Sequence, residues 1–227
     1  MNLHRKTMQK EWTKNTQMYR NCIGMTGRRP NEDEFFEVVK DILSKFDLHS
    51  PGIKRLLDVG CNNGYLLNCL KPNAEQLVGI DFCIDSLYEA KKLIPELNTL
   101  HGEITKLPFC DNTFDRVLCY NMFHYLPSSE TALNAANTLY RVLSPGGFLL
   151  IGDLFTEECK QLIPESLIEH WNSPFRPFMH RPENWLFVSL ESLTMFFRQM
   201  KATQVLVYEQ KGDIRCAGFR RDLVVQK

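Results

Sequence analysis

The fold is decided by the stretch Leu56-Leu57-Asp58-Val59-Gly60-Cys61-Asn62-Asn63-Gly64-Tyr65-Leu66-Leu67. Its first part is a short apolar run, which is typical of a buried parallel strand. The run breaks into a turn that holds two glycines and two asparagines, and apolar residues at helical spacing resume at Tyr65. A strand, a glycine turn and a helix in this order predict the first unit of a nucleotide-binding αβ fold. The helix N-terminus would offer backbone N–H groups to a polar ligand.

The second predicted strand ends at Asp81, about 20 residues after Gly60, which is the offset at which a carboxylate meets a ribose hydroxyl. The dinucleotide fingerprint G-x-G-x-x-G does not fit, because Asn62 and Tyr65 stand where it needs glycine. Asn62 still suits the turn, because asparagine tolerates left-handed backbone dihedrals. Two other interpretations stay open at this point: Asp81 as a helix N-cap or surface acid, and a turn that binds no ligand.

Strand and helix patterns then alternate along the chain. After a helix at 31–46, strands are expected at 53–59, 76–81, 99–103, 114–120 and 148–151, with helices between them. Ser189 is expected to cap a final helix, and a hairpin of strands at 203–208 and 214–219 closes the chain. This alternation predicts an α/β fold with a doubly wound, mostly parallel, seven-stranded sheet. Helices would cover both faces, and the C-terminal hairpin would supply an antiparallel strand.

The length of 227 residues favours one domain. We divide it into an N-terminal helical cap (1–50), a cofactor-binding half (51–153), an acceptor-side insertion (154–187) and a final helix and hairpin (188–227). The insertion is rich in proline and aromatic residues, and we expect it over the carboxyl ends of the strands. Within it His170, Arg176, His180 and Arg181 are candidates for reading a polar or anionic acceptor.

Charge and cysteine usage narrow the class of protein. Lysine plus arginine equals aspartate plus glutamate, at 27 each, so no overall field favours nucleic acid or an anionic membrane. The 8 cysteines contain no C-x-x-C pair, and the candidate ligands lack the regular spacing of a metal site. No apolar N-terminal leader and no long apolar run is present. We therefore expect a reduced, soluble, cytoplasmic protein without a metal.

Several motifs together resemble one family. Asp58-x-Gly60-x-x-x-Gly64 resembles the first motif of class I S-adenosylmethionine (SAM) dependent methyltransferases, Asp/Glu-x-Gly-x-Gly-x-Gly, with Asn62 replacing the middle glycine. The segment from Gly102-Glu103-Ile104 through Leu107-Pro108-Phe109 to Phe114-Asp115 resembles that family's adenine loop. Residues 143–147 resemble the turn before its fifth strand. The match is collinear from residue 53 to about 151.

The resemblance implies SAM as the cofactor. Asp81 would accept hydrogen bonds from the ribose diol, and Glu103 would accept one from the adenine amino group. The Ile104 N–H would meet the adenine ring, and Phe82 would pack on its face. The glycine turn would let the methionine portion approach the backbone. The predicted cofactor-binding residues are Tyr19, Asp58, Gly60, Cys61, Asn62, Gly64, Asp81, Phe82, Glu103, Ile104 and Asn121.

The acceptor would lie after the fourth strand, at Asn121-Met122-Phe123-His124-Tyr125-Leu126-Pro127. This segment lacks the Asp/Asn-Pro-Pro-Tyr/Phe motif of enzymes that methylate nucleic-acid bases. His124 is the candidate general base, because only histidine titrates near neutral pH when unperturbed; alternatively it only shapes the loop. Tyr125 is predicted to line the acceptor pocket, and Asp153 ends the fifth strand, where ligands bind in open α/β sheets. These three residues are the predicted catalytic set.

The sequence therefore predicts a SAM-dependent methyltransferase that acts on a small molecule, at a hydroxyl oxygen of a sugar or natural-product type metabolite or at nitrogen. No nucleic-acid or membrane partner is expected. Three alternatives remain. One is an enzyme of the same fold that uses SAM differently. Another is a catalytically silent scaffold that keeps the fold and binds SAM or a partner protein. The third is a nicotinamide dehydrogenase, which the missing glycines disfavour.

Overall fold

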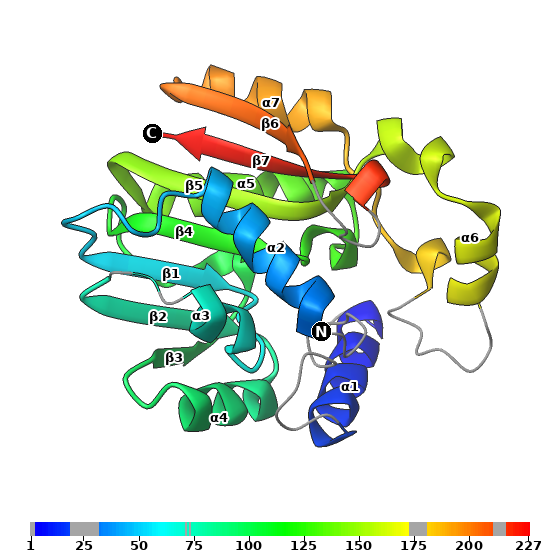
Figure 1. Ribbon diagram of the computed structural model, residues 1–227, viewed down its shortest axis with the longest axis horizontal. Helices are drawn as coiled ribbons and strands as arrows, with labels where there is room; N and C mark the ends of the chain where they lie inside the picture. Colours follow the sequence, from blue (N-terminus) through cyan, green and yellow to red (C-terminus); the bar gives the residue numbers. More distant parts are fainter. Residues whose placement is uncertain (1–2, 19–31, 71, 73, 173–180, 211–216) are drawn as a thin grey trace.

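The computed structural model describes residues 3–18, 32–70, 72, 74–172, 181–210 and 217–227 (Figure 1). Its centre is a seven-stranded sheet in the order β3-β2-β1-β4-β5-β7-β6. Strands β1 to β5 pair in parallel, whereas β7 runs antiparallel to both β5 and β6. The predicted fold class is confirmed. The strands are β1 (Arg55–Val59), β2 (Gln76–Asp81), β3 (Asn98–His101), β4 (Phe114–Tyr120), β5 (Leu143–Phe155), β6 (Gln204–Glu209) and β7 (Arg220–Gln226).

Helices cover both faces of the sheet, because successive strand side chains point to opposite faces. On one face Leu57 and Val117 pack with α5 (Ser129–Val142) and α7 (Leu190–Gln199). On the other face Leu56 and Leu118 pack with α2 (Glu32–Lys45), α3 (Tyr65–Leu70) and α4 (Ile84–Leu93). As predicted, Ser189 caps α7, and its hydroxyl oxygen accepts the Ser192 N–H at 3.1 Å. An apolar core therefore packs on each face of the sheet, and together the two cores fix the positions of the strands' carboxyl ends.

Two further segments lie beyond the carboxyl ends of β1 and β4, where the arrowheads point in Figure 1. One is α1 (Leu3–Met18), which joins α4 through a 2.9 Å hydrogen bond between the buried Thr16 and Ser86 hydroxyls. The other contains the 3-10 helix η4 (Glu157–Leu162), α6 (Glu165–Trp171) and the 3-10 helix η6 (Pro182–Asn184). It is tied to the loop after β4, because the Leu186 N–H donates to the His124 carbonyl at 2.9 Å. These two segments therefore cover the carboxyl ends of the strands from two sides.

Two strand assignments need correction. The predicted strand at 214–219 is wrong over residues 217–219, which form a 3-10 helix before β7 begins at Arg220; residues 214–216 lie outside the described part of the chain. The charged residues Arg220 and Asp222 belong to β7 because ion pairs bury both side chains. The predicted strand 148–151 is only the middle of β5, which runs from Leu143 to Phe155. The expected cap at Asn31 lies outside the described residues.

Candidate active site

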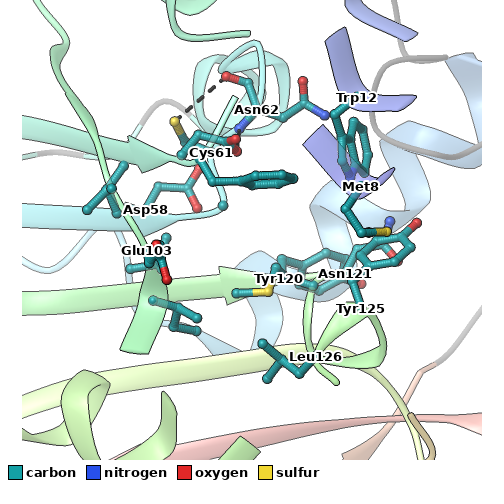
Figure 2. Close-up of a pocket in the computed structure, with 18 of the residues that line it drawn as sticks. Met8, Trp12, Asp58, Cys61, Asn62, Glu103, Tyr120, Asn121, Tyr125 and Leu126 are labelled. Atoms are coloured by element: carbon teal, nitrogen blue, oxygen red, sulfur yellow. Dashed lines mark hydrogen bonds between the residues drawn. The ribbon is translucent and has the colours of Figure 1, made fainter. Parts of the chain in front are cut away.

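A cavity of about 310 Å³ lies over the carboxyl ends of β1, β2 and β4. The strands and the loops after them supply its floor, while α1 contributes Met8 and Trp12 and α2 contributes Phe35 and Val38. In the view of Figure 2, Met8, Trp12 and Tyr125 gather on one side, and Asp58 and Glu103 lie on the other. The cavity thus joins an acidic side, built by the sheet, to an apolar side, built largely by the N-terminal helices.

The turn after β1 is shaped for a close approach to its backbone. Gly60 has φ +79°, and a Cβ atom there would lie 3.1 Å from Met122 Cγ. Asn62 has φ 50°, so the residue in place of the middle glycine adopts the left-handed backbone that the turn requires. Gly64 has φ +72° and faces α4, where a Cβ atom would lie 3.3 Å from Ala90 Cβ. Of the residues predicted to bind the cofactor in this turn, Gly60, Cys61 and Asn62 line the cavity, whereas Gly64 packs against α4.

Two buried carboxylates flank this turn. Asp58 and Asp81 are only 3% and 7% exposed, and both line the cavity. Asp81 accepts the Asn62 N–H at 2.9 Å and the Cys83 N–H at 2.8 Å, one on each carboxylate oxygen. Cys83 is itself the N-cap residue of α4, so Asp81 does not hold that position. Each Asp81 oxygen retains lone-pair capacity for a ligand hydroxyl.

Burial raises the pKa of both carboxyl groups. The pKa of Asp58 rises to about 7, first because the group is desolvated and second because Asp81 is negatively charged. The pKa of Asp81 rises to about 6 through desolvation, and the N–H donors of Cys83 and Asn62 limit the rise. A ligand that brings positive charge or hydroxyl donors would stabilise both ionised groups. The charge pattern therefore fits a cationic ligand.

The loop after β3 forms the far end of the cavity. Glu103, half-buried, and Ile104, buried, both line it, as does Phe82 from the loop after β2. The 3-10 helix η2 (Ile104–Lys106) is fixed to α5, because the Thr138 hydroxyl donates to the Ile104 carbonyl. These placements agree with the residues predicted for an adenine pocket. Asn121, after β4, also lines the cavity.

The three predicted catalytic residues lie in different surroundings. Tyr125 lines the cavity, and its ring meets Trp12 edge-on with centroids 5.8 Å apart. His124 is 2% exposed and packs among Tyr125, Phe155 and Trp185 behind the cavity wall. Asp153 is 1% exposed and pairs with Arg220 instead of facing the cavity. The structure thus brings only Tyr125 of the three to the cavity wall.

Other predicted contacts lie elsewhere or outside the described residues. Tyr19, Arg176 and His180 belong to the segments that the structure does not describe. His170 is exposed on α6, and Arg181 lies 3.9 Å from Glu183. No group of histidine, cysteine, aspartate or glutamate side chains within the described ranges could hold a metal ion. Within the same ranges, every helix is too short or too polar to cross a membrane.

Sequence reasoning missed the apolar side of the cavity. Phe35 and Val38 lie in the helix predicted at 31–46, where their helical spacing indicates only a buried face, and they also line the cavity. Met8 and Trp12 lie on a helix with little amphipathic pattern, so their inward position follows from the docking of α1 onto α4. A lone tryptophan in a polar segment was the one available signal for this side.

Comparisons with known proteins agree with this geometry. Residues 57–151 match the methyltransferase domain family. Phthiotriol/phenolphthiotriol dimycocerosates methyltransferase 1 of Mycobacterium ulcerans is 31% identical over 140 residues, which cover 58% of this chain and 48% of that protein. A tRNA U34 carboxymethyltransferase of Nautilia profundicola is 27% identical over 153 residues, 63% of this chain and 50% of that protein. The chain spans about half the length of these two relatives.

The fold is similar to that of solved structures over almost its whole length. The N-methyltransferase NodS from Bradyrhizobium japonicum, solved in complex with S-adenosylhomocysteine (SAH), matches with a TM-score of 0.61. The match covers 99% of this chain and 97% of NodS at 14% sequence identity. At that identity the likeness shows a shared fold.

Proposed function

We propose, on the premise that residues 57–151 belong to the class I SAM-dependent methyltransferase family, that the chain transfers a methyl group from SAM to a small-molecule acceptor. The observation that carries this proposal is the pair of buried carboxylates, Asp58 and Asp81, on either side of a glycine turn that lines the cavity. The residues present fit SAM, which brings a positive charge, a ribose diol and an adenine. Bound SAM would supply an electrophilic methyl group on its sulfonium.

The protein's share of the reaction is binding and orientation. Asp81 would accept hydrogen bonds from the ribose, and Glu103 would accept one from the adenine amino group. Asp58 would add negative charge beside the glycine turn, at the methionine portion. Holding donor and acceptor in line within a cavity shielded from water by α1 and α2 would supply most of the rate enhancement.

The apolar side of the cavity supports a small acceptor with a hydrophobic portion. Trp12, Phe35 and Tyr120 line this side, and within the described part of the lining the charged residues are all acidic. A phosphate-bearing acceptor would meet unfavourable electrostatics there. This supports a neutral or cationic small molecule, methylated at oxygen or nitrogen, over the tRNA on which the Nautilia relative acts.

The proposal is tested by measuring transfer from labelled SAM. A panel of neutral phenols, amines and glycosides should contain acceptors, whereas tRNA and total RNA should take up no label. Labelled RNA without any labelled small molecule would contradict the proposed acceptor class. The scaffold alternative predicts that SAM and SAH bind in calorimetric titration but that no acceptor is labelled. Binding of NAD in preference to both would favour the dehydrogenase.

The role of His124 as the general base is a separate proposal. If His124 removes a proton from a hydroxyl acceptor, it must do so from its place behind Tyr125, with ring centroids 3.9 Å apart. His124→Ala should then preserve SAH binding and lower kcat by about 10²–10⁴-fold. If His124 only shapes the loop, the same change should lower the melting temperature and leave kcat near normal. In that case Tyr125→Phe becomes the informative variant.

A further inference from the structure

The C-terminal hairpin, at one edge of the sheet, contacts two residues that line the cavity. Gln210 follows β6 and Arg220 begins β7, so the two side chains lie at the same end of the hairpin. Both contact the end of β4, where Tyr120 and Asn121 line the cavity. Neither Gln210 nor Arg220 belongs to the segment that matches the methyltransferase domain family, residues 57–151.

Arg220 holds Asn121 through a charged hydrogen bond. Its Nη1 atom lies 3.4 Å from Asn121 Oδ1 and also pairs with the Asp153 carboxylate. Asn121 has φ 57°, a left-handed backbone, and its N–H donates to the Gly152 carbonyl at 3.0 Å. With Oδ1 facing the guanidinium, the amide group is oriented so that its Nδ2 donors point away from Arg220. That orientation suits an acceptor oxygen such as the carboxylate of a bound amino acid portion.

Tyr120 is also held in place by a residue of the hairpin. Its ring lies so close to β5 that a Cβ atom on Gly152 would come within 2.2 Å of Tyr120 Cδ2. Gln210 Nε2 donates to the Tyr120 hydroxyl at 2.9 Å and to Asp153 Oδ1 at 3.0 Å. Two adjacent cavity residues are therefore each held by one residue of the hairpin.

Stabilisation of the fold is a weak explanation for this buried network of charged side chains. Asp153 and Asp222 are almost fully buried, and Asp222 also pairs with the buried Lys45 at 2.9 Å. Taking several charges out of water is expensive, and well-packed apolar side chains often stabilise such a site equally well. Arg220 also packs over the Phe155 ring at 4.1 Å, so its position is defined by contacts on more than one side. A network of this kind is suited to holding polar groups in one orientation.

We propose that Arg220 is a positioning residue that holds the Asn121 side chain in the orientation needed to bind the amino acid portion of the cofactor. The proposal rests on the proposed function. It extends the functional machinery from the glycine turn to the C-terminal hairpin, because Arg220 acts through Asn121 without lining the cavity itself.

The test is a double-mutant cycle read by calorimetric titration with SAH and by melting temperature. The background variant carries Arg220→Met together with Asp153→Asn, so that no buried carboxylate loses its partner and asparagine accommodates the φ of 61° at position 153. Asn121→Gly, which also tolerates its positive φ, is made in the wild type and in this background. Arg221→Met is the matched control, because Arg221 pairs with the exposed Glu209 at 3.1 Å on the same hairpin.

The Arg220→Met, Asp153→Asn protein should melt close to the wild type but bind SAH about 3- to 10-fold more weakly, the effect of losing one hydrogen bond. Asn121→Gly should weaken SAH binding in the wild type and change it little in the variant background. Arg221→Met should bind SAH normally. Unchanged SAH affinity in the Arg220→Met, Asp153→Asn protein, or fully additive effects with Asn121→Gly, would overturn the positioning role alone. Absence of SAH binding by the wild type would overturn the proposed function and this inference together.

Discussion

The raised pKa of Asp58 makes cofactor binding dependent on pH in a way that one substitution should remove. Asp58 titrates near pH 7 in the free protein because it is buried beside Asp81. Only its ionised form attracts a positively charged group, such as the α-ammonium that SAH shares with SAM, so a proton must leave before binding is favourable. The perturbation is Asp58→Asn, which keeps the shape of the side chain and removes the titration.

The magnitude follows from the two pKa values. With a pKa of about 7, Asp58 is roughly 9% ionised at pH 6.0 and roughly 76% ionised at pH 7.5, so SAH affinity should rise about eightfold between them. Asp81, with a pKa of about 6, changes from roughly half to almost fully ionised and adds a factor of about two. The wild type should therefore gain about 10- to 20-fold in affinity over this range, and Asp58→Asn only about twofold.

The assay is calorimetric titration with SAH at four pH values between 6.0 and 7.5, in buffers of different ionisation enthalpy. Proton release on binding should be measurable for the wild type near pH 6.5 and much smaller for Asp58→Asn. The same slope of affinity with pH in both proteins would refute the assignment. A wild type whose affinity does not change would show that Asp58 is already ionised in the free cavity.

The raised pKa of Asp58 also makes the stability of the ligand-free protein depend on pH. A carboxyl group whose pKa is higher in the folded protein than in the unfolded chain destabilises the fold at high pH, and stability returns as the pH falls through the folded-state value. Between pH 8 and pH 6 the ligand-free protein should therefore become more stable. Asp58→Asn should raise the melting temperature at pH 8 while weakening SAH binding. Scanning calorimetry of both proteins without ligand checks the sign.

Four further substitutions test the cavity and the docking of α1 over it. Asp81→Ala should weaken SAH binding by roughly 1.5–3 kcal/mol in a protein that still folds, and unchanged affinity would reject the ribose contact. Gly60→Val should abolish SAH binding because φ is +79° and Met122 is close, whereas Asn62→Gly should be tolerated; titration of both against the wild type is the check. Thr16→Val should lower the free energy of unfolding in urea by about 1–3 kcal/mol, because the buried Ser86 hydroxyl loses its partner; no change would mean that α1 docks without it.

The cofactor half was predictable because its chemistry is local in sequence. A turn that admits a ligand needs glycine or asparagine at particular dihedrals, and Gly60 and Asn62 adopt those dihedrals. The carboxyl end of a parallel strand fixes where Asp81 lies, whatever the rest of the chain does. Both constraints act within a few residues, so spacing alone placed these side chains in the cavity, and residues 57–151 match the methyltransferase domain family.

The apolar side was not predictable by the same reasoning. Trp12 reaches the cavity only because α1 docks on α4 through Thr16 and Ser86, a contact between residues 70 positions apart in the sequence. Phe35 belongs to a regular apolar stripe, and periodicity identifies which face of a helix is buried but not what it is buried against. Positions of this kind depend on tertiary packing.

Asp153 does not face the ligand site, although it lies near the carboxyl end of a strand, because its backbone φ is positive. A strand-end carboxylate should face the ligand edge of the sheet, and β5 does end nearby. The β5–β7 register, however, shifts between Ile151 and Leu154, and Asp153 has φ 61°. The bulge turns the side chain toward Arg220 of β7, away from the cavity. Gly152 is a weak sequence signal for that bulge, because a glycine inside a strand often marks one. The orientation of Asp153 also depends on pairing with β7, whose start was predicted six residues too early. The start of β7 and the orientation of Asp153 therefore depend on the same contact, the buried ion pair between Asp153 and Arg220.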